Sequence, residues 1–184
     1  ETTQQWENIT THVDMQNNVI YGETNHLSIF AVHSLLIHDL SIFSVHAFKT
    51  IIGKGYTLNI DVDVRNEGDF EETFDATIDL VAGQISYLAI FSVHIVNGNT
   101  VTLHFTWNTA SNAMDTYNIV AHVSQVPYEI DVSDNTLADG TIKVTIPGDV
   151  NGDFFVNIKD ATQIGLYWLQ TAPPAPANVD VNGD

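Results

Sequence analysis

The stretch Tyr56-Thr57-Leu58-Asn59-Ile60-Asp61-Val62-Asp63-Val64-Arg65 decides the fold class, because apolar and polar side chains alternate along it without a fault. One face carries only apolar side chains and the other only polar ones. A period of two predicts a β-strand with one buried and one solvated face. The next residues, Asn66-Glu67-Gly68-Asp69, predict a turn at the end of that strand.

Strand-like runs continue on both sides of this stretch. They cover residues 40–48, 73–80, 85–96, 101–107, 117–123 and 141–146, and Asn97-Gly98-Asn99 predicts a tight turn between two of them. About seven strands separated by turns predict an all-β fold, an Ig-like antiparallel β-sandwich over residues 38–147. The aromatic side chains on the inward faces are expected in its core: Tyr56, Phe74, Phe105, Trp107 and Tyr117.

Residues 1–37 form a separate N-terminal segment. Short strands are predicted at 6–13, 19–21 and 27–33. About three strands cannot bury a core of their own. They therefore add to the sandwich, end a preceding module, or pair with another chain as an augmenting or donor segment.

Composition excludes several functions. The 184 residues contain 5 Lys and Arg against 23 Asp and Glu, a formal net charge of -18. So few cations exclude a nucleic-acid interface and argue against docking on anionic membranes. No apolar run has the length of a membrane span, and the absence of Cys excludes disulfides and thiolate chemistry.

The C-terminal region, residues 148–184, carries the strongest chemical signal. Between Asp149 and Asp160, oxygen-bearing side chains stand at positions 1, 3, 5, 9 and 12 of a twelve-residue loop. Calcium prefers six to eight oxygen ligands, and this spacing wraps them around one centre. The predicted ligands are Asp149, Asn151, Asp153, Asn157 and Asp160, with the backbone carbonyl of Phe155 at position 7.

A helix is predicted over residues 160–170, with Asp160 as both the closing ligand and the N-cap, and Val156 is expected to pin the loop to the core. Position 6 of such a loop requires a sharp turn, which strains Phe154 if its φ is positive. The alternative interpretation of the loop is an acidic turn that binds no ion.

The opening of this loop recurs as Asp180-Val181-Asn182-Gly183-Asp184, after a Pro-rich linker. Its predicted ligands are Asp180, Asn182 and Asp184, which are too few to hold an ion by themselves. We therefore expect the chain to be an excerpt of a longer polypeptide, or the second loop to be completed by a neighbour.

Two loop-and-helix repeats of the form D-x-N-x-D…V-N-x-x-D resemble a dockerin domain, truncated here within its second loop. The resemblance implies Ca²⁺ as the bound ion, the ligand positions given above, and a cohesin-like protein as partner.

The sandwich has its own resemblance. His38-Asp39-Leu40-Ser41-Ile42, Val62-Asp63-Val64-Arg65-Asn66-Glu67-Gly68 and Asp131-Val132-Ser133-Asp134-Asn135-Thr136 are similar to a CARDB-type domain, a cell-adhesion-related Ig-like module. The resemblance covers roughly residues 38–146 and implies no catalytic residues. Joined to a dockerin-like tail, it is similar to archaeal and bacterial multidomain proteins that are extracellular or lie on the cell surface.

Other polar residues carry weaker signals. Eight His residues are scattered without metal-ligand spacing. The acidic group Glu67, Asp69, Glu71 and Glu72 is expected to be a solvated turn more readily than a catalytic pair or a second cation site. The same expectation holds for Glu129, Asp131, Asp134 and Asp139. Asn8-Ile9-Thr10 is an N-glycosylation sequon, with Asn8 as the acceptor.

Three functions follow as hypotheses. The leading one is a non-catalytic extracellular structural or adhesive building block that is stabilised by calcium. Such a block could self-assemble head-to-tail into a fibre, a homo-oligomer formed by strand addition through residues 1–37. The second is a dockerin-type binding module that anchors a surface protein to a cohesin. The third, which we rank lowest, is a fragment of a glycosidase.

Overall fold

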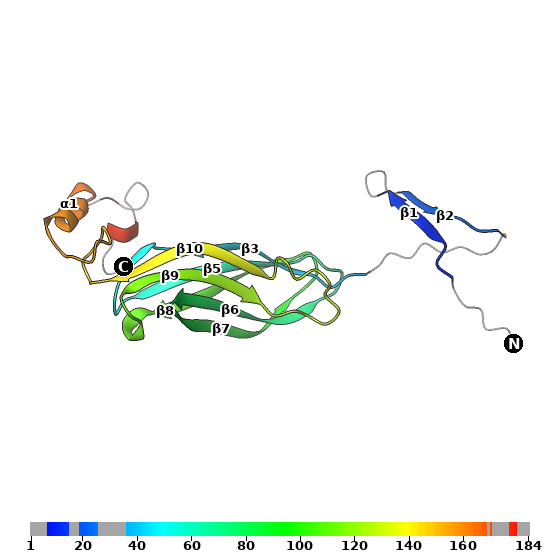
Figure 1. Ribbon diagram of the computed structural model, residues 1–184, viewed down its shortest axis with the longest axis horizontal. Coiled ribbons are helices and arrows are strands. Elements are labelled where there is room, and N and C mark those ends of the chain that lie inside the picture. Colours follow the sequence, from blue (N-terminus) through cyan, green and yellow to red (C-terminus); the bar gives the residue numbers. More distant parts are fainter. Residues whose placement is uncertain (1–6, 15–18, 26–35, 169, 171–176, 180–184) are drawn as a thin grey trace. The chain divides into compact units, whose positions relative to one another are not determined.

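The computed structural model describes residues 7–14, 19–25, 36–168, 170 and 177–179 (Figure 1). The chain divides into two compact units, Glu1–Leu35 and Leu36–Asp184. In the first unit, β1 (Thr10–Asp14) pairs antiparallel with β2 (Val19–Gly22). The predicted strand at 27–33 lies outside the described residues.

The second unit contains two sheets packed face to face (Figure 1). The three-stranded sheet has the order β3-β5-β8, formed by β3 (Leu40–Ala47), β5 (Thr57–Asn66) and β8 (Thr100–Asn108). The five-stranded sheet has the order β4-β10-β9-β6-β7. Its strands are β4 (Ile51–Gly53), β6 (Glu72–Ala82), β7 (Gln84–Ile95), β9 (Asp115–Val123) and β10 (Thr136–Thr145). All pairs are antiparallel except β4 with β10, so the predicted antiparallel β-sandwich is confirmed.

The core lies between the inner faces of the sheets. Leu58, Ile60, Val62 and Val64 of β5 are each at most 1% exposed, as their alternation predicts. Across the core, the Trp107 ring meets Tyr117 edge to face, with 5.0 Å between the ring centroids. Tyr56 is an exception to the prediction. It precedes β5 in the turn after Gly55 and is 37% exposed.

Two features of the sheet differ from the predicted strands. β4 was not predicted, because three residues are too few to show a period. β10 begins at Thr136, five residues before the predicted start at 141. The register shifts between Ala138 and Gly140, where Gly140 has φ +103°, and this bulge breaks the alternation on which the prediction rests.

The C-terminal segment contains helix α1 (Ile158–Leu166), which begins two residues before the predicted start. Asn157 is the N-cap, and Asp160 is the third helical residue, so the prediction that Asp160 caps the helix is wrong. The Asn157 side chain accepts from the Lys159 amide, and the Asp160 side chain accepts from the Asn157 amide. This reciprocal arrangement is a capping box, which fixes the start of the helix.

Single-turn 3₁₀ helices lie at Thr109–Ser111 and Ala177–Val179. Among the described residues, no helix has the length and apolar character needed to cross a membrane.

Candidate metal centre

Asp149 organises the first half of the predicted ligand loop. Its side chain is 4% exposed. Oδ1 accepts hydrogen bonds from the amides of Gly152 (2.8 Å) and Asp153 (3.2 Å), and Oδ2 accepts one from the amide of Phe154 (2.8 Å). The Thr145 hydroxyl, at the end of β10, also donates to Oδ2. The Asp149 carboxylate therefore holds the backbone of the next five residues, 150–154, in a turn around it.

Asp160 closes the loop from the other end and is 1% exposed. Its Oδ1 accepts from the amides of Val150 (3.0 Å) and Asn151 (3.3 Å), and its Oδ2 accepts from the Asn157 amide (2.8 Å). These backbone N–H groups, the Asn157 amide foremost, lower the pKa of the Asp160 carboxyl against the opposing effect of burial. Asp160 is therefore held as a buried anion.

The remaining predicted ligands of this loop make local turns. Asn151 Oδ1 accepts from the Asp153 amide at 2.8 Å, and Asp153 Oδ1 accepts from the Phe155 amide at 2.9 Å. The Phe155 side chain is 70% exposed. The structure thus brings the predicted ligands into one compact loop, but in the described part of the chain no three His, Asp or Glu side chains converge closely enough to hold a metal ion.

The donor set nevertheless fits calcium chemically, because carboxylate and amide oxygens are the ligands that this ion prefers. The backbone of the loop is turned as such a loop requires. Gly152 has φ +73° and Phe154 has φ +67°, so the positive φ that would strain Phe154 is present. Lys143 Nζ lies 5.2 Å from the centroid of the Phe154 ring, a distance at which a cation–π contact offsets part of that strain.

The loop packs on the sandwich through residues that the sequence did not single out. Val150 is 4% exposed, whereas Val156, the predicted anchor, is 54% exposed, so that prediction is wrong. Lys143 of β10 donates to the Gly152 carbonyl at 2.8 Å. A Cβ on Gly152 would lie 3.0 Å from Ile51 Cδ1 in β4, which shows how closely the loop approaches the sheet. The same valine recurs as Val181 in the second motif, so the repeat offers a sequence signal that Val150 has a structural role.

The other predicted sites have separate outcomes. The second-loop residues Asp180, Asn182 and Asp184 lie outside the described residues. Asn8 is exposed, as glycosylation requires, and its Oδ1 accepts from the Thr10 amide at 3.0 Å. Its modification stays a prediction.

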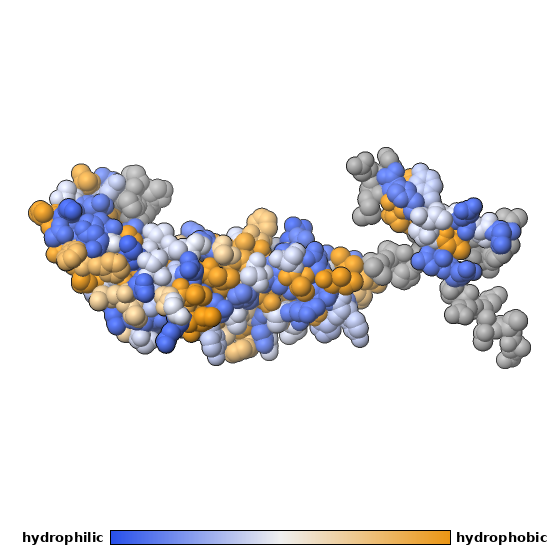
Figure 2. Space-filling view, in the orientation of Figure 1, coloured by the Kyte–Doolittle hydropathy of each residue, from blue (hydrophilic) through white to orange (hydrophobic). Residues whose placement is uncertain are grey.

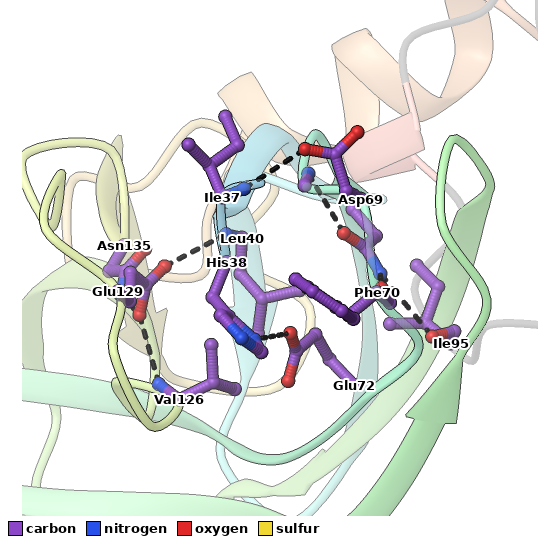
Figure 3. Close-up of polar contacts among 12 residues, drawn as sticks. Ile37, His38, Leu40, Asp69, Phe70, Glu72, Ile95, Val126, Glu129 and Asn135 are labelled. Atoms are coloured by element: carbon purple, nitrogen blue, oxygen red, sulfur yellow. Dashed lines mark hydrogen bonds and ion pairs between the residues drawn. The ribbon is translucent and has the colours of Figure 1, made fainter. Parts of the chain in front are cut away.

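The acidic turn after β5 is less solvated than predicted (Figure 3). Glu72 is 6% exposed, and its Oε1 lies 2.5 Å from His38 Nδ1. Asp69 Oδ2 accepts from the Ile37 amide at 2.9 Å. These carboxylates fasten the chain before β3 to the β5–β6 turn, which is a structural role.

Comparison with known protein families gives a match for the C-terminal segment. Residues 147–184 match the dockerin type I domain. No curated protein sequence matches the chain.

Solved structures similar to the chain include the CARDB domain of the PF1109 protein from Pyrococcus furiosus, determined in complex with di-metal ions. It has 16% identity over 62% of this chain and 99% of that one, with a TM-score of 0.49. The solution structure of the same domain has 16% identity over 60% and 97%, with a TM-score of 0.49. A β-glucosidase from Erythrobacter marinus has 15% identity over 61% of this chain and 16% of its own, with a TM-score of 0.42. The chain therefore consists of an antiparallel β-sandwich followed by a segment, residues 147–184, that is similar to a dockerin type I domain.

Proposed function

We propose that this chain is a non-catalytic, extracellular or cell-surface assembly module whose C-terminal loop binds Ca²⁺. The observation that carries the proposal is the pair of buried carboxylates, Asp149 and Asp160, held at the two ends of one oxygen-rich loop. Asn151, Asp153, Asn157 and the Phe155 carbonyl would complete the ligands. The ion would supply the charge that neutralises these carboxylates.

The packing of the loop gives calcium a structural consequence. Because Val150 and Gly152 lie against the sandwich, an ion that orders the loop would also fix the dockerin-like segment to β10 and β4. Asn178 strengthens the same junction, since its Oδ1 accepts from the Ile51 amide at 3.3 Å. The sandwich then acts as a spacer that carries a docking element in a defined orientation.

The docking element would bind a cohesin-like protein. Its described surface exposes large apolar side chains, and a concentration of them is typical of a protein-binding surface. They are Phe155, Val156, Ile158, Leu166 and Trp168, each at least 54% exposed. Orange apolar residues occur among the polar ones of this segment in Figure 2.

Calorimetric titration of the full chain with CaCl₂ tests the calcium site. Asp160→Asn is expected to weaken binding of one ion by about tenfold or more, because a buried ligand charge is lost. Asp79→Asn, on β6, is the control and is expected to bind calcium as the wild type does. Equal titrations for the wild type and Asp160→Asn would contradict the proposal. A cohesin should then be captured in calcium and released by a chelator.

A second candidate is assembly into fibres by strand addition. It is favoured by the two-stranded β1–β2 sheet, in which Val13, Ile20 and Tyr21 are exposed and no described side chain is buried. Light scattering and electron microscopy of the full chain in calcium test it, and a strictly monomeric chain would exclude it.

A further inference from the structure

A second group of acidic residues meets at the opposite end of the sandwich, where β3 and β10 begin. Asp39 immediately precedes β3, and Asp134 and Asn135 immediately precede β10. The Ile42 amide donates to the Asp134 carbonyl at 2.9 Å, which holds the two strand starts together. β10 ends at Thr145, beside the calcium loop, so its ten residues separate the two places by roughly 30 Å.

Glu129 links Asn135 of this group to Leu40, the residue after Asp39 (Figure 3). Its carboxylate is 4% exposed, and Oε1 accepts from the Leu40 amide at 2.8 Å. Its Oε2 accepts from the Val126 amide at 2.9 Å and from Asn135 Nδ2 at 3.0 Å. Both oxygens of Glu129 therefore accept hydrogen bonds from N–H donors. Because Glu129 accepts from both Leu40 and Asn135, it holds the Asn135 carboxamide close to Leu40.

Three oxygens in this group have no hydrogen-bond partner. They are Oδ1 of Asp39, Oδ1 of Asp134 and Oδ1 of Asn135, all shielded from solvent. Asn135 is only 5% exposed, and its amide nitrogen is already used by Glu129. Buried polar atoms without partners are rare, and each one destabilises the folded state. Since all three atoms are hydrogen-bond acceptors, either a cation or a hydrogen-bond donor would satisfy them.

The electrostatics agree with this interpretation. Burial raises the pKa of Asp39, and the neighbouring carboxylates of Asp134 and Glu129 raise it further. Burial is also the main cause that raises the pKa of Asp134, with Asp131 and Glu67 adding to it. Each carboxylate charge in the group therefore makes ionisation of the neighbouring carboxyl groups less favourable. A bound cation would reverse this effect.

We propose that Asp39, Asp134 and Asn135 form a second cation site, with Ca²⁺ as the ion. Two carboxylates and one amide supply hard oxygen ligands, and water and backbone carbonyls complete the six to eight that calcium takes. Glu129 is a positioning residue, because its oxygens are engaged by N–H donors and it orients Asn135. The competing explanation is that Asp39 and Asp134 share a proton and no ion binds.

Calorimetric titration of the full chain with CaCl₂ distinguishes the two. Asp134→Asn is expected to weaken the binding of one ion by about tenfold or more. The control is Asp79→Asn on β6, whose carboxylate lies 3.3 Å from His122 Nε2 and belongs to neither proposed site, and it is expected to leave the titration unchanged. In chelator, Asp134→Asn should melt above the wild type, because a buried repulsion is gone, and added calcium should raise its melting temperature less.

An Asp134→Asn titration identical to that of the wild type would overturn the inference. If Asp134→Asn fails to fold by circular dichroism, Asp39→Asn serves the same comparison. Failure at this site and failure at the loop are separable, because Asp160→Asn removes only the loop ion. Asp134→Asn combined with Asp160→Asn should lose both.

Discussion

At the residue scale, Glu129 shows how a single buried charge holds distant segments in register. Its carboxylate accepts three N–H donors, from Leu40, Val126 and Asn135. Replacing it with Gln would turn an NH₂ group toward one of these donors and remove charge-assisted hydrogen bonds. We expect Glu129→Gln to lower the free energy of unfolding by about 2 kcal/mol, measured by denaturant titration.

The matched control is Glu71→Gln. The Glu71 side chain is 73% exposed, and its carboxylate lies 3.6 Å from His94 Nε2. Exposed ion pairs contribute little, so we expect a change below about 0.5 kcal/mol. Similar losses for the two variants would show that Glu129 does not have the organising role that its contacts indicate.

Gly68 gives a second prediction at this scale, and its cause is steric. A Cβ there would lie 2.8 Å from both Asp39 N and Ile37 O, which are backbone atoms that cannot rotate away. Gly68→Ala should therefore destabilise the fold by about 1–3 kcal/mol. Gly165→Ala in α1 is the control, because a Cβ on Gly165 would meet no atom within 4 Å and Ala favours helices. A loss of stability for Gly165→Ala that matched Gly68→Ala would contradict the steric explanation.

At the scale of elements, sequence reasoning succeeded where one physical pattern dominates. The alternation in β5 is readable because one of its faces is fully buried, and the loop at 149–160 is recognisable because its oxygen-bearing side chains are local in sequence. The bulge in β10 and the Asn157 cap were missed, since each depends on backbone geometry that alternation does not encode. The sequence predicts a solvated turn at Asp134, because the approach of Asp39 to it depends on contact between strands of two different sheets.

Strand pairing also predicts a pH dependence. Asp63, on the central strand β5, accepts hydroxyl hydrogen bonds from Thr102 on β8 (2.6 Å) and Ser44 on β3 (2.7 Å). These two bonds, the one from Thr102 foremost, lower the pKa of the Asp63 carboxyl. A lowered folded pKa means that the ionised group stabilises the fold above about pH 4, and this contribution is lost as the pH falls through the folded pKa.

Thr102→Val is therefore expected to raise the pKa of Asp63 toward its ordinary value and to shrink the loss of stability in acid. Titration of the carboxyl carbon by NMR measures the first effect, and unfolding at a series of pH values measures the second. Thr106→Val is the control, because the Thr106 hydroxyl donates to Asn59 and not to a carboxylate. An Asp63 pKa that stays unchanged in Thr102→Val would refute the assignment.

At the scale of the whole molecule, the net charge of -18 acquires a structural meaning. Part of it is concentrated at the two ends of the sandwich, at Asp149 and Asp160 and at Asp39 and Asp134. Both places combine carboxylates withdrawn from solvent with a shortage of cationic partners in the sequence as a whole, which has 5 Lys and Arg. With no Cys to cross-link it, the second unit depends on its core and, under our proposals, on bound calcium.

The division into two units gives the last prediction. Unit Leu36–Asp184 contains all the buried apolar side chains among the described residues, whereas the described apolar side chains of unit Glu1–Leu35, such as Ile20 and Tyr21, are about half exposed. A chain that begins at Leu36 should therefore fold and melt within about 4 °C of the full chain by calorimetry. A chain that ends at Thr145 should melt lower, because it loses Val150 and the Lys143 contact. A large fall in melting temperature on removing residues 1–35 would mean that the N-terminal unit stabilises the sandwich and that the division is wrong.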